Sequence, residues 1–138
     1  MRKWVLVFIA YWFSISYIAE ATIRTNTEKT FEVIWERLIT AITYVESRND
    51  DKAYNKKSGA LGRFQMKKIY VDDVNRILKM KKIKKKYSYE DRKNHKKARE
   101  MFDIIQTHYN PEKDIDKAIV LHRGKVSKRY IKEIKAHM

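Results

Sequence analysis

A single glutamate at the end of an apolar helical pattern is the residue best placed for acid–base chemistry. Glu46 follows Ile42 by four residues and Val45 by one, which puts its carboxyl group at the border of the apolar face of a helix. Partial burial favours the protonated form of a carboxyl group, and a general acid needs that form. The position also suits an ordinary glutamate at a helix end, so periodicity leaves both interpretations open.

Two glycines and a glutamine follow Glu46 after a polar, turn-rich stretch. In the sequence GALGRFQ, Gly59 and Gly62 allow a turn with positive φ and a close approach of the backbone. Gln65 offers both a donor and an acceptor to an amide or hydroxyl ligand. If this pattern forms a site, we expect Gln65 to face the same cleft as Glu46.

The elements that must position these residues are predicted to be helices. Apolar residues recur at helical spacing, with Thr30 and Ser88 as candidate N-terminal caps. In the second stretch Ile69, Val74 and Ile77 fall on one side. The predicted helices span about 30–46, 67–80, 88–108, 114–122 and a short final stretch around 130–134. Strand alternation is absent over any useful length, so we predict a mostly α fold.

The chain is strongly basic, with a net charge of +15 over 138 residues. Such a surplus favours a polyanionic partner, which includes nucleic acid, an anionic membrane face and an acidic cell-wall polymer. The densest run, Lys79–Lys86, is either a solvated surface or an electrostatic contact to such a polymer. The absence of cysteine excludes disulfides, thiolate metal sites and a cysteine nucleophile. The histidines lack metal-binding spacing, so no metal and no cofactor are predicted.

The first 21 residues have the form of an export signal. A short basic start precedes an apolar run at residues 4–18, and the sequence AEA at 19–21 suits signal-peptidase cleavage. The run is shorter than the roughly 20 residues of a membrane span. We therefore predict a signal peptide over 1–21 and one domain over 22–138, with an uncleaved membrane anchor as the alternative. Export predicts a periplasmic or extracellular location and argues against nucleic acid as the partner.

The stretch from residue 46 to residue 66 resembles the catalytic core of the lytic transglycosylase and goose-type lysozyme superfamily. Members carry Glu-Ser at a helix end, a short polar loop, and then Gly-x-x-Gly-x-x-Gln before a hydrophobic residue. The matching residues here are Glu46-Ser47 and Gly59-Ala60-Leu61-Gly62-Arg63-Phe64-Gln65-Met66. The resemblance extends over about residues 33–136. It implies a small lysozyme-like helical domain with a substrate cleft and at most a minimal β-hairpin, near residues 50–64.

The chemistry that the resemblance implies uses one carboxyl group. Members cleave the β-1,4 bond between N-acetylmuramic acid and N-acetylglucosamine in peptidoglycan. By resemblance, Glu46 would first protonate the leaving glycosidic oxygen. In transglycosylases the same group then takes the proton of the muramyl 6-hydroxyl and a 1,6-anhydro ring closes, whereas in the lysozymes water is the acceptor. The second carboxylate usual in glycosidases would be absent, with Asp50 and Asp51 as helpers only.

The resemblance also implies a set of substrate contacts. Gln65 matches the family glutamine that contacts the sugar beside the scissile bond, and Tyr130 matches a late tyrosine that lines the cleft. Asn55 falls where members often have serine, and Ser47 belongs to the Glu-Ser pair. His122 stands where the family has the asparagine of a Tyr-Asn-x-Gly motif, so the aromatic–amide pair is replaced here by Leu-His.

The prediction that combines these features is an exported lytic transglycosylase that acts as a monomer on peptidoglycan glycan strands. A lysozyme-type hydrolase is one alternative. The other is a non-catalytic, basic protein that binds glycan or membrane on the same fold, which the changed late motif favours. A plain helical bundle would have no use for the glycine–glutamine motif.

Overall fold

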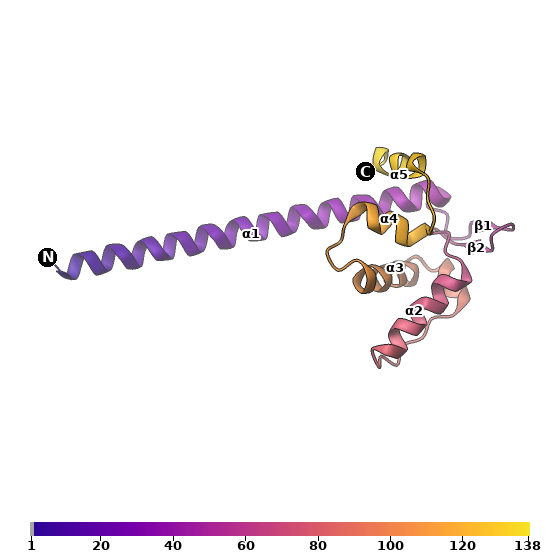
Figure 1. The fold of residues 1–138 in the computed structure, drawn as a ribbon, viewed down its shortest axis with the longest axis horizontal. Helices are drawn as coiled ribbons and strands as arrows, with labels where there is room; N and C mark the ends of the chain where they lie inside the picture. Colours follow the sequence, from indigo (N-terminus) through magenta and orange to yellow (C-terminus); the bar gives the residue numbers. More distant parts are fainter. Residues whose placement is uncertain (1) are drawn as a thin grey trace. The chain divides into compact units, whose positions relative to one another are not determined.

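The computed structural model describes the backbone of residues 2–138 and the side chains of residues 20–138. Its elements (Figure 1) are α1 Arg2–Ser47, β1 Tyr54–Asn55, β2 Ala60–Leu61, α2 Lys68–Met80, the 3-10 helix η1 Tyr89–Lys93, α3 His95–Tyr109, α4 Ile115–Arg123 and α5 Lys128–Ala136. The two short strands pair antiparallel. These elements confirm the predicted mostly α fold with a minimal β-hairpin.

The chain divides into two units, residues 1–34 and residues 35–138. In the first unit, residues 20–34 are helical and almost all exposed. No helix within the described part of the chain is both long enough and apolar enough to cross a bilayer. Most side chains of the predicted signal peptide, 1–21, lie outside the described residues, so export stays a prediction.

The predicted start of the first helix at Thr30 is wrong. Helix α1 continues through this position, and the Thr30 hydroxyl donates a hydrogen bond to the carbonyl oxygen of Asn26, one turn earlier, at 2.9 Å. No glycine or proline occurs among residues 1–30 to interrupt the helix, so the threonine lies inside it and does not cap it. The predicted end is confirmed, since α1 ends at Ser47, one residue after Glu46.

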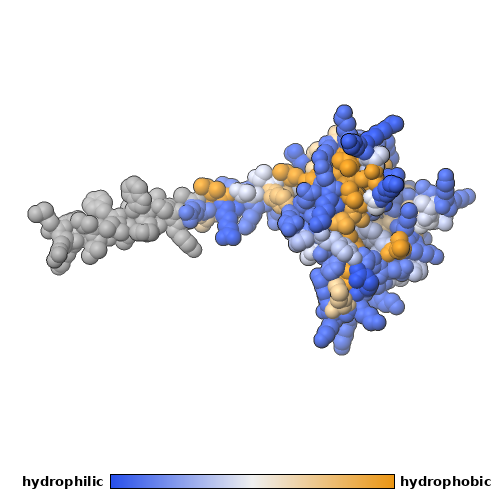
Figure 2. All heavy atoms as spheres, in the orientation of Figure 1, coloured by the Kyte–Doolittle hydropathy of each residue, from blue (hydrophilic) through white to orange (hydrophobic). Residues whose placement is uncertain are grey.

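The core of the second unit lies where the last turns of α1 meet the other helices. The rings of Trp35 on α1 and Phe102 on α3 lie 6.3 Å apart. Figure 2 shows apolar atoms in a band on this unit, surrounded by hydrophilic side chains. The fully buried side chains from the helices include Leu38, Ile42, Val71, Val74, Ile77, Met101, Phe102, Ile119 and Ile134. Ile69, expected on the apolar side of α2, is 72% exposed.

The predicted third helix is in fact two elements. Ser88 forms the expected capping box with Asp91, but it begins η1 and not an α-helix. Helix α3 starts only at His95, where the Asn94 side chain caps its first turn. The two helices that follow confirm the prediction, and the Asp114 side chain caps α4.

The turn that carries the glycine motif is packed tightly against η1. Gly62 has φ of +79°, and a Cβ atom at this position would lie 1.9 Å from the carbonyl oxygen of Arg92. Arg92 is 4% exposed, and its guanidinium donates to the carbonyl oxygens of Tyr89 at 2.6 Å, Gly59 at 3.0 Å and Met66 at 2.9 Å. Burial lowers the pKa of Arg92, yet an arginine of this kind remains charged. The side chain and the backbone of one arginine therefore hold the whole turn.

This packing predicts unequal effects of alanine at the two glycines. Gly62→Ala should lower the free energy of unfolding by roughly 3 kcal/mol or more, because the new methyl group meets backbone atoms and the φ angle is unfavourable. Gly59→Ala should cost only about 1 kcal/mol, from its φ angle alone, since nothing lies within 4 Å of a Cβ there. Urea unfolding followed by circular dichroism measures both. Equal losses would contradict the close approach to Arg92.

Candidate functional site

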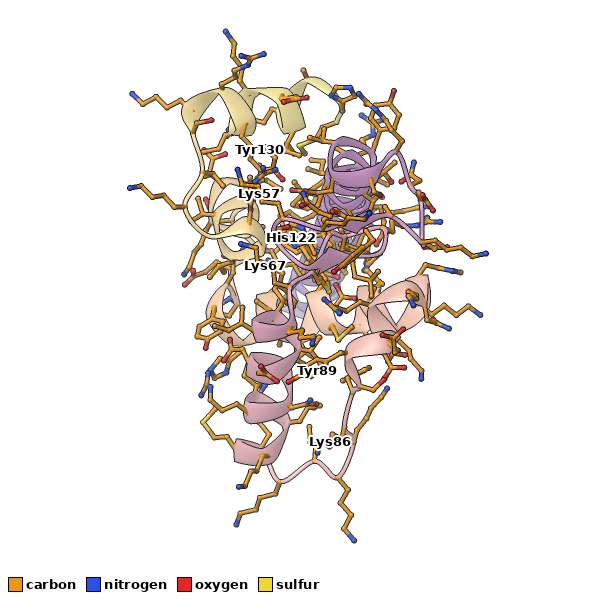
Figure 3. The ribbon with its side chains drawn as sticks, turned by 90° about the vertical axis from the view of Figure 1, so that its right-hand side faces the viewer. Lys57, Lys67, Lys86, Tyr89, His122 and Tyr130 are labelled. Atoms are coloured by element: carbon orange, nitrogen blue, oxygen red, sulfur yellow. The ribbon has the colours of Figure 1, made fainter. Side chains whose placement is uncertain are left out.

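A cavity of about 920 Å³ brings together residues from α1, the hairpin, α2 and α4. Glu46, Asn55, Gln65 and His122 all line it. Glu46 and Gln65 therefore face the same cavity, as the motif required. Tyr130 on α5, labelled in Figure 3 together with His122, contacts Glu46 directly.

Two side chains hold the carboxyl group of Glu46 through one of its oxygens. The Tyr130 hydroxyl donates to Oε1, and Arg123 Nη1 donates to the same oxygen at 3.0 Å. The Glu46 side chain is 10% exposed. Within the described part of the chain, Oε2 accepts no hydrogen bond. The carboxyl group is thus fixed at one oxygen and leaves the other for a ligand in the cavity.

Arg123 and Tyr130 also contact each other. The guanidinium carbon of Arg123 lies 4.2 Å from the centre of the Tyr130 ring. Burial opposes the charge of Arg123, but the Tyr130 hydroxyl and the Glu46 carboxylate raise its pKa above the ordinary value. Burial, and next the hydrogen bond to Glu46, raise the pKa of Tyr130, so this hydroxyl stays protonated and acts as a donor.

Sequence reasoning predicted Tyr130 and missed Arg123. The signal that was available is its place in the sequence, directly before Gly124, in the segment matched to the late Tyr-Asn-x-Gly motif. Arg123 occupies the variable position of that motif, where the resemblance implies no role. Its partner lies 77 residues earlier, so no local pattern indicates the ion pair.

Gln65 supports the hairpin as well as lining the cavity. Its Nε2 donates to the carbonyl oxygens of Ala53 and Gly62, each at 3.0 Å. Its φ angle is +50°, an uncommon value for a residue with a side chain. The amide nitrogen is therefore occupied by the protein, and Oε1 is the atom available to a ligand.

These contacts predict that Gln65→Ala lowers stability. The substitution removes two hydrogen bonds from the base of the hairpin and should reduce the free energy of unfolding by about 1–2 kcal/mol. Gln65→Gly loses the same bonds but accepts the positive φ, so it should be less destabilised than the alanine variant. Urea unfolding of the three proteins provides the comparison. An unchanged midpoint in Gln65→Ala would show that the two bonds contribute nothing.

Ser47 does not line the cavity, contrary to its expected role in substrate binding. Its hydroxyl bonds to the carbonyl oxygens of Arg63 at 2.8 Å and Thr43 at 3.2 Å, and so ties the end of α1 to the glycine turn. The expected helpers also lie outside the cavity lining. Asp51 pairs with the Arg63 side chain at 2.9 Å, and Asp50 accepts a hydrogen bond from the backbone two residues later. These acidic groups stabilise the loop.

Asn55 lines the cavity, but part of its side chain is used within the hairpin. Its Oδ1 accepts hydrogen bonds from the backbone N–H groups of Lys57 and Ser58, each at 3.1 Å. The asparagine therefore closes the turn, as short polar side chains commonly do. Only its amide nitrogen is left to contact a ligand.

His122 fills the place of the expected asparagine with a buried ring. It is 8% exposed, and its ring centre lies 5.9 Å from those of Phe64 and Tyr70 and 5.7 Å from that of Phe102. Burial lowers its pKa, against the opposing effects of Glu46 and the Phe64 carbonyl group. The imidazole is therefore neutral at neutral pH. The Phe64 contact also accounts for an aromatic residue inside the glycine motif.

The lowered pKa of His122 predicts a pH dependence of stability. The ordinary pKa of a histidine is 6.5. Just below this pH, His122 is largely protonated in the unfolded chain but remains neutral in the folded protein. The free energy of unfolding should therefore fall as the pH falls through 6.5 toward the folded-state pKa, with a slope of up to about 1.4 kcal/mol per pH unit.

Urea unfolding of the wild type and His122→Gln at a series of pH values tests this dependence. The variant should lose this part of the slope, while the same substitution at the exposed His95 is the control. Identical slopes in the wild type and His122→Gln would show that His122 does not couple protonation to folding.

The lysine run lies away from the cavity. None of Lys79–Lys86 lines it, and Lys86 lies at the opposite end of the view from Tyr130 (Figure 3). Lys85 bonds to Glu100 at 2.6 Å, which together with Tyr87 raises its pKa. A contact of this run with an anionic polymer stays a prediction. Among the described residues, no group of three or more His, Asp or Glu side chains is arranged to hold a metal ion.

Comparison with known proteins adds no family. No protein-family model, curated protein or solved structure matches the chain. A functional conclusion must therefore come from the cavity, its charged groups and the motif residues that line it.

Proposed function

We propose that the chain is a peptidoglycan-cleaving enzyme that breaks the β-1,4 bond between N-acetylmuramic acid and N-acetylglucosamine. The observation that carries the proposal is the meeting of Glu46 and Gln65 in one cavity of about 920 Å³. A cavity of this size suits a ligand of several sugar-sized groups. The two residues are the acid and the amide of the family motif, so their shared location supports a common ligand.

The arrangement around Glu46 suits a group that acts first as acid and then as base. Oε2 is open to donate a proton to the glycosidic oxygen, while Oε1 is held by Tyr130 and Arg123. Once the proton has left, both donors stabilise the carboxylate. That carboxylate then takes the proton of the muramyl 6-hydroxyl, whose oxygen closes the 1,6-anhydro ring.

The other carboxylates that line the cavity are already engaged. Asp72 accepts a hydrogen bond from the Tyr89 hydroxyl at 2.8 Å, and Asp73 pairs with Arg76 at 2.7 Å. Glycosidases that use two carboxylates need a second group facing the first across the sugar. The proposal assigns the acid and base steps to Glu46 alone, as the resemblance implies, and assigns no step to either aspartate.

One feature favours the non-catalytic alternative, a basic glycan- or membrane-binding protein. Arg123 donates a hydrogen bond to the Glu46 carboxyl group, whereas a general acid must itself deliver a proton to the substrate. Catalysis in this proposal includes a step in which substrate binding loosens this contact. If it does not, the cavity binds glycan without cleaving it.

We further propose that the protein is exported and acts as a monomer on the anionic cell wall. The net charge of +15 would raise its concentration near a polymer that carries carboxylates, an effect that salt screens. A lysozyme-type hydrolase would share this location and the same acid, and would differ only in using water as the acceptor.

The proposed role of Glu46 predicts that Glu46→Gln abolishes cleavage. The amide keeps an oxygen for Tyr130 and Arg123 but has no proton to donate as an acid, so activity should fall by roughly 100- to 10,000-fold or more. Stability should change little. Digestion of purified peptidoglycan, with mass analysis of the released muropeptides, measures the effect.

The products also separate the alternatives. Anhydro ends indicate the transglycosylase, reducing ends indicate the hydrolase, and no products from the wild type indicate a binding protein. Glu133→Gln, at an exposed position on α5, is the matched control and should retain full activity. Cleavage by Glu46→Gln at the wild-type rate would remove Glu46 from the mechanism.

A further inference from the structure

We propose that Arg123 and Lys125, on either side of Gly124, bind a carboxylate of the peptide stem that the glycan carries. The inference rests on the proposed function, because it names the part of the substrate that this corner of the cavity recognises. Both side chains line the same cavity as Glu46. The corner is formed by the connection between α4 and α5, outside the residues that the motif assigns.

The first observation is that Arg123 is only partly used by the protein. Its side chain is 49% exposed, and its ion pair with Glu46 involves Nη1 at 3.0 Å from a single carboxylate oxygen. A guanidinium presents a planar fork of N–H donors that suits a two-oxygen acceptor. The N–H donors that face neither Glu46 nor Tyr130 are available for a second acceptor from the ligand.

The ring of Tyr130 keeps the guanidinium in place for this role. The contact of 4.2 Å between the guanidinium carbon and the ring centre is a cation–π interaction. It limits the motion of a long side chain whose end is in solvent. An arginine restrained in this way loses less conformational entropy when it binds an anion than a free one does.

The second observation is the excess of positive charge at this corner. Lys125 is exposed and forms no ion pair with any carboxylate that the structure describes. Among the same described carboxylates, Arg123 pairs with Glu46 only. Gly124 has φ of +86°, and nothing lies within 4 Å of a Cβ built on it. The connection is therefore open, and the side chains on either side of it both line the cavity.

The chemistry of the substrate decides which anion fits. The N-acetylated sugars of the glycan are neutral, so their rings offer nothing to two cations. The muramic acid residue at the scissile bond carries the peptide stem, whose carboxylates lie close to the bond that Glu46 would cleave. A sugar bound at Glu46 thus brings an acidic group toward Arg123 and Lys125.

Binding of that carboxylate would also act on Glu46. The stem carboxylate and the Glu46 carboxyl group would both bind the Arg123 guanidinium. The contact between Arg123 and Glu46 therefore weakens when substrate is bound. The contact between Arg123 and Oε1 of Glu46 is then loosened by the substrate itself. Glycan whose stem carboxylates are amidated would leave the pair intact.

A pair of matched ligands tests the proposal. One is the disaccharide N-acetylglucosaminyl-N-acetylmuramic acid with its peptide stem, and the other is the same molecule with the stem carboxylates amidated. The scissile bond joins C1 of N-acetylmuramic acid to the next N-acetylglucosamine, and neither ligand contains that bond. Isothermal titration calorimetry on the full chain therefore measures binding without turnover. The wild type should bind the acidic form about tenfold more tightly, a modest preference because the guanidinium is half exposed.

The preference should depend on Arg123 and Lys125. Arg123→Gln should bring the two dissociation constants within about twofold of each other, and Lys125→Gln, which leaves the Glu46 ion pair intact, should reduce the preference to about threefold. Arg129→Gln makes the same charge change at an exposed position on α5 outside the cavity lining, and should keep the wild-type preference.

Two outcomes overturn the proposal. Equal binding of the two ligands by the wild type would show that no carboxylate is recognised, and a full preference in both Arg123→Gln and Lys125→Gln would place the recognition elsewhere. These readouts do not depend on cleavage. A wild type that binds the acidic ligand preferentially but releases no muropeptides would contradict the enzyme and leave the carboxylate site standing.

Discussion

The close approach of Gly62 to the backbone of Arg92 is the constraint on which the candidate site depends. A side chain at residue 62 would collide with the Arg92 carbonyl group, and the buried guanidinium of the same arginine binds carbonyl groups on both sides of the turn. Backbone polar groups in a tight buried turn need partners, and one arginine supplies several. With the turn fixed, Phe64 enters the core and Gln65 reaches the cavity. The 3-10 helix that carries Arg92 thus has no residue in the cavity and yet determines its geometry.

The site combines a deeply held carboxyl group with a strongly basic surface. One oxygen of Glu46 accepts hydrogen bonds from Arg123 and Tyr130. The neutral ring of His122 lies among aromatic side chains. A cation that lines the cavity interacts with a bound anion more strongly than a lysine fully exposed to solvent does. The distinction explains why we assign binding to Arg123 and Lys125 and leave the run at residues 79–86 as surface.

Local patterns predicted the helices and the turn at the glycine motif, because spacing and turn chemistry are read over a few neighbouring residues. The minimal hairpin was predicted from the resemblance. Two local inferences were wrong. Thr30 has the chemistry of a cap, but a cap forms only where the preceding chain leaves the helix, and nothing there stops it. Ser88 is a cap, but of a 3-10 turn. The ion pair of Arg123 was out of reach, since it joins helices far apart in sequence. The hydrogen bond from the Ser47 hydroxyl to the Arg63 carbonyl oxygen was out of reach for a related reason, because its acceptor lies 16 residues later.

Glu46, Arg123 and Tyr130 are far apart in the sequence, which has a consequence for folding during synthesis. The chain is synthesised from its N-terminus, so the glutamate emerges first, while the arginine and the tyrosine that hold it follow 77 and 84 residues later. An incomplete chain therefore contains the acid without the groups that orient it. Domains fold as units once their elements are available, and of these three residues Tyr130 on α5 is the last to be synthesised. The arrangement around the Glu46 carboxyl group can therefore form only after α4 and α5 have been made.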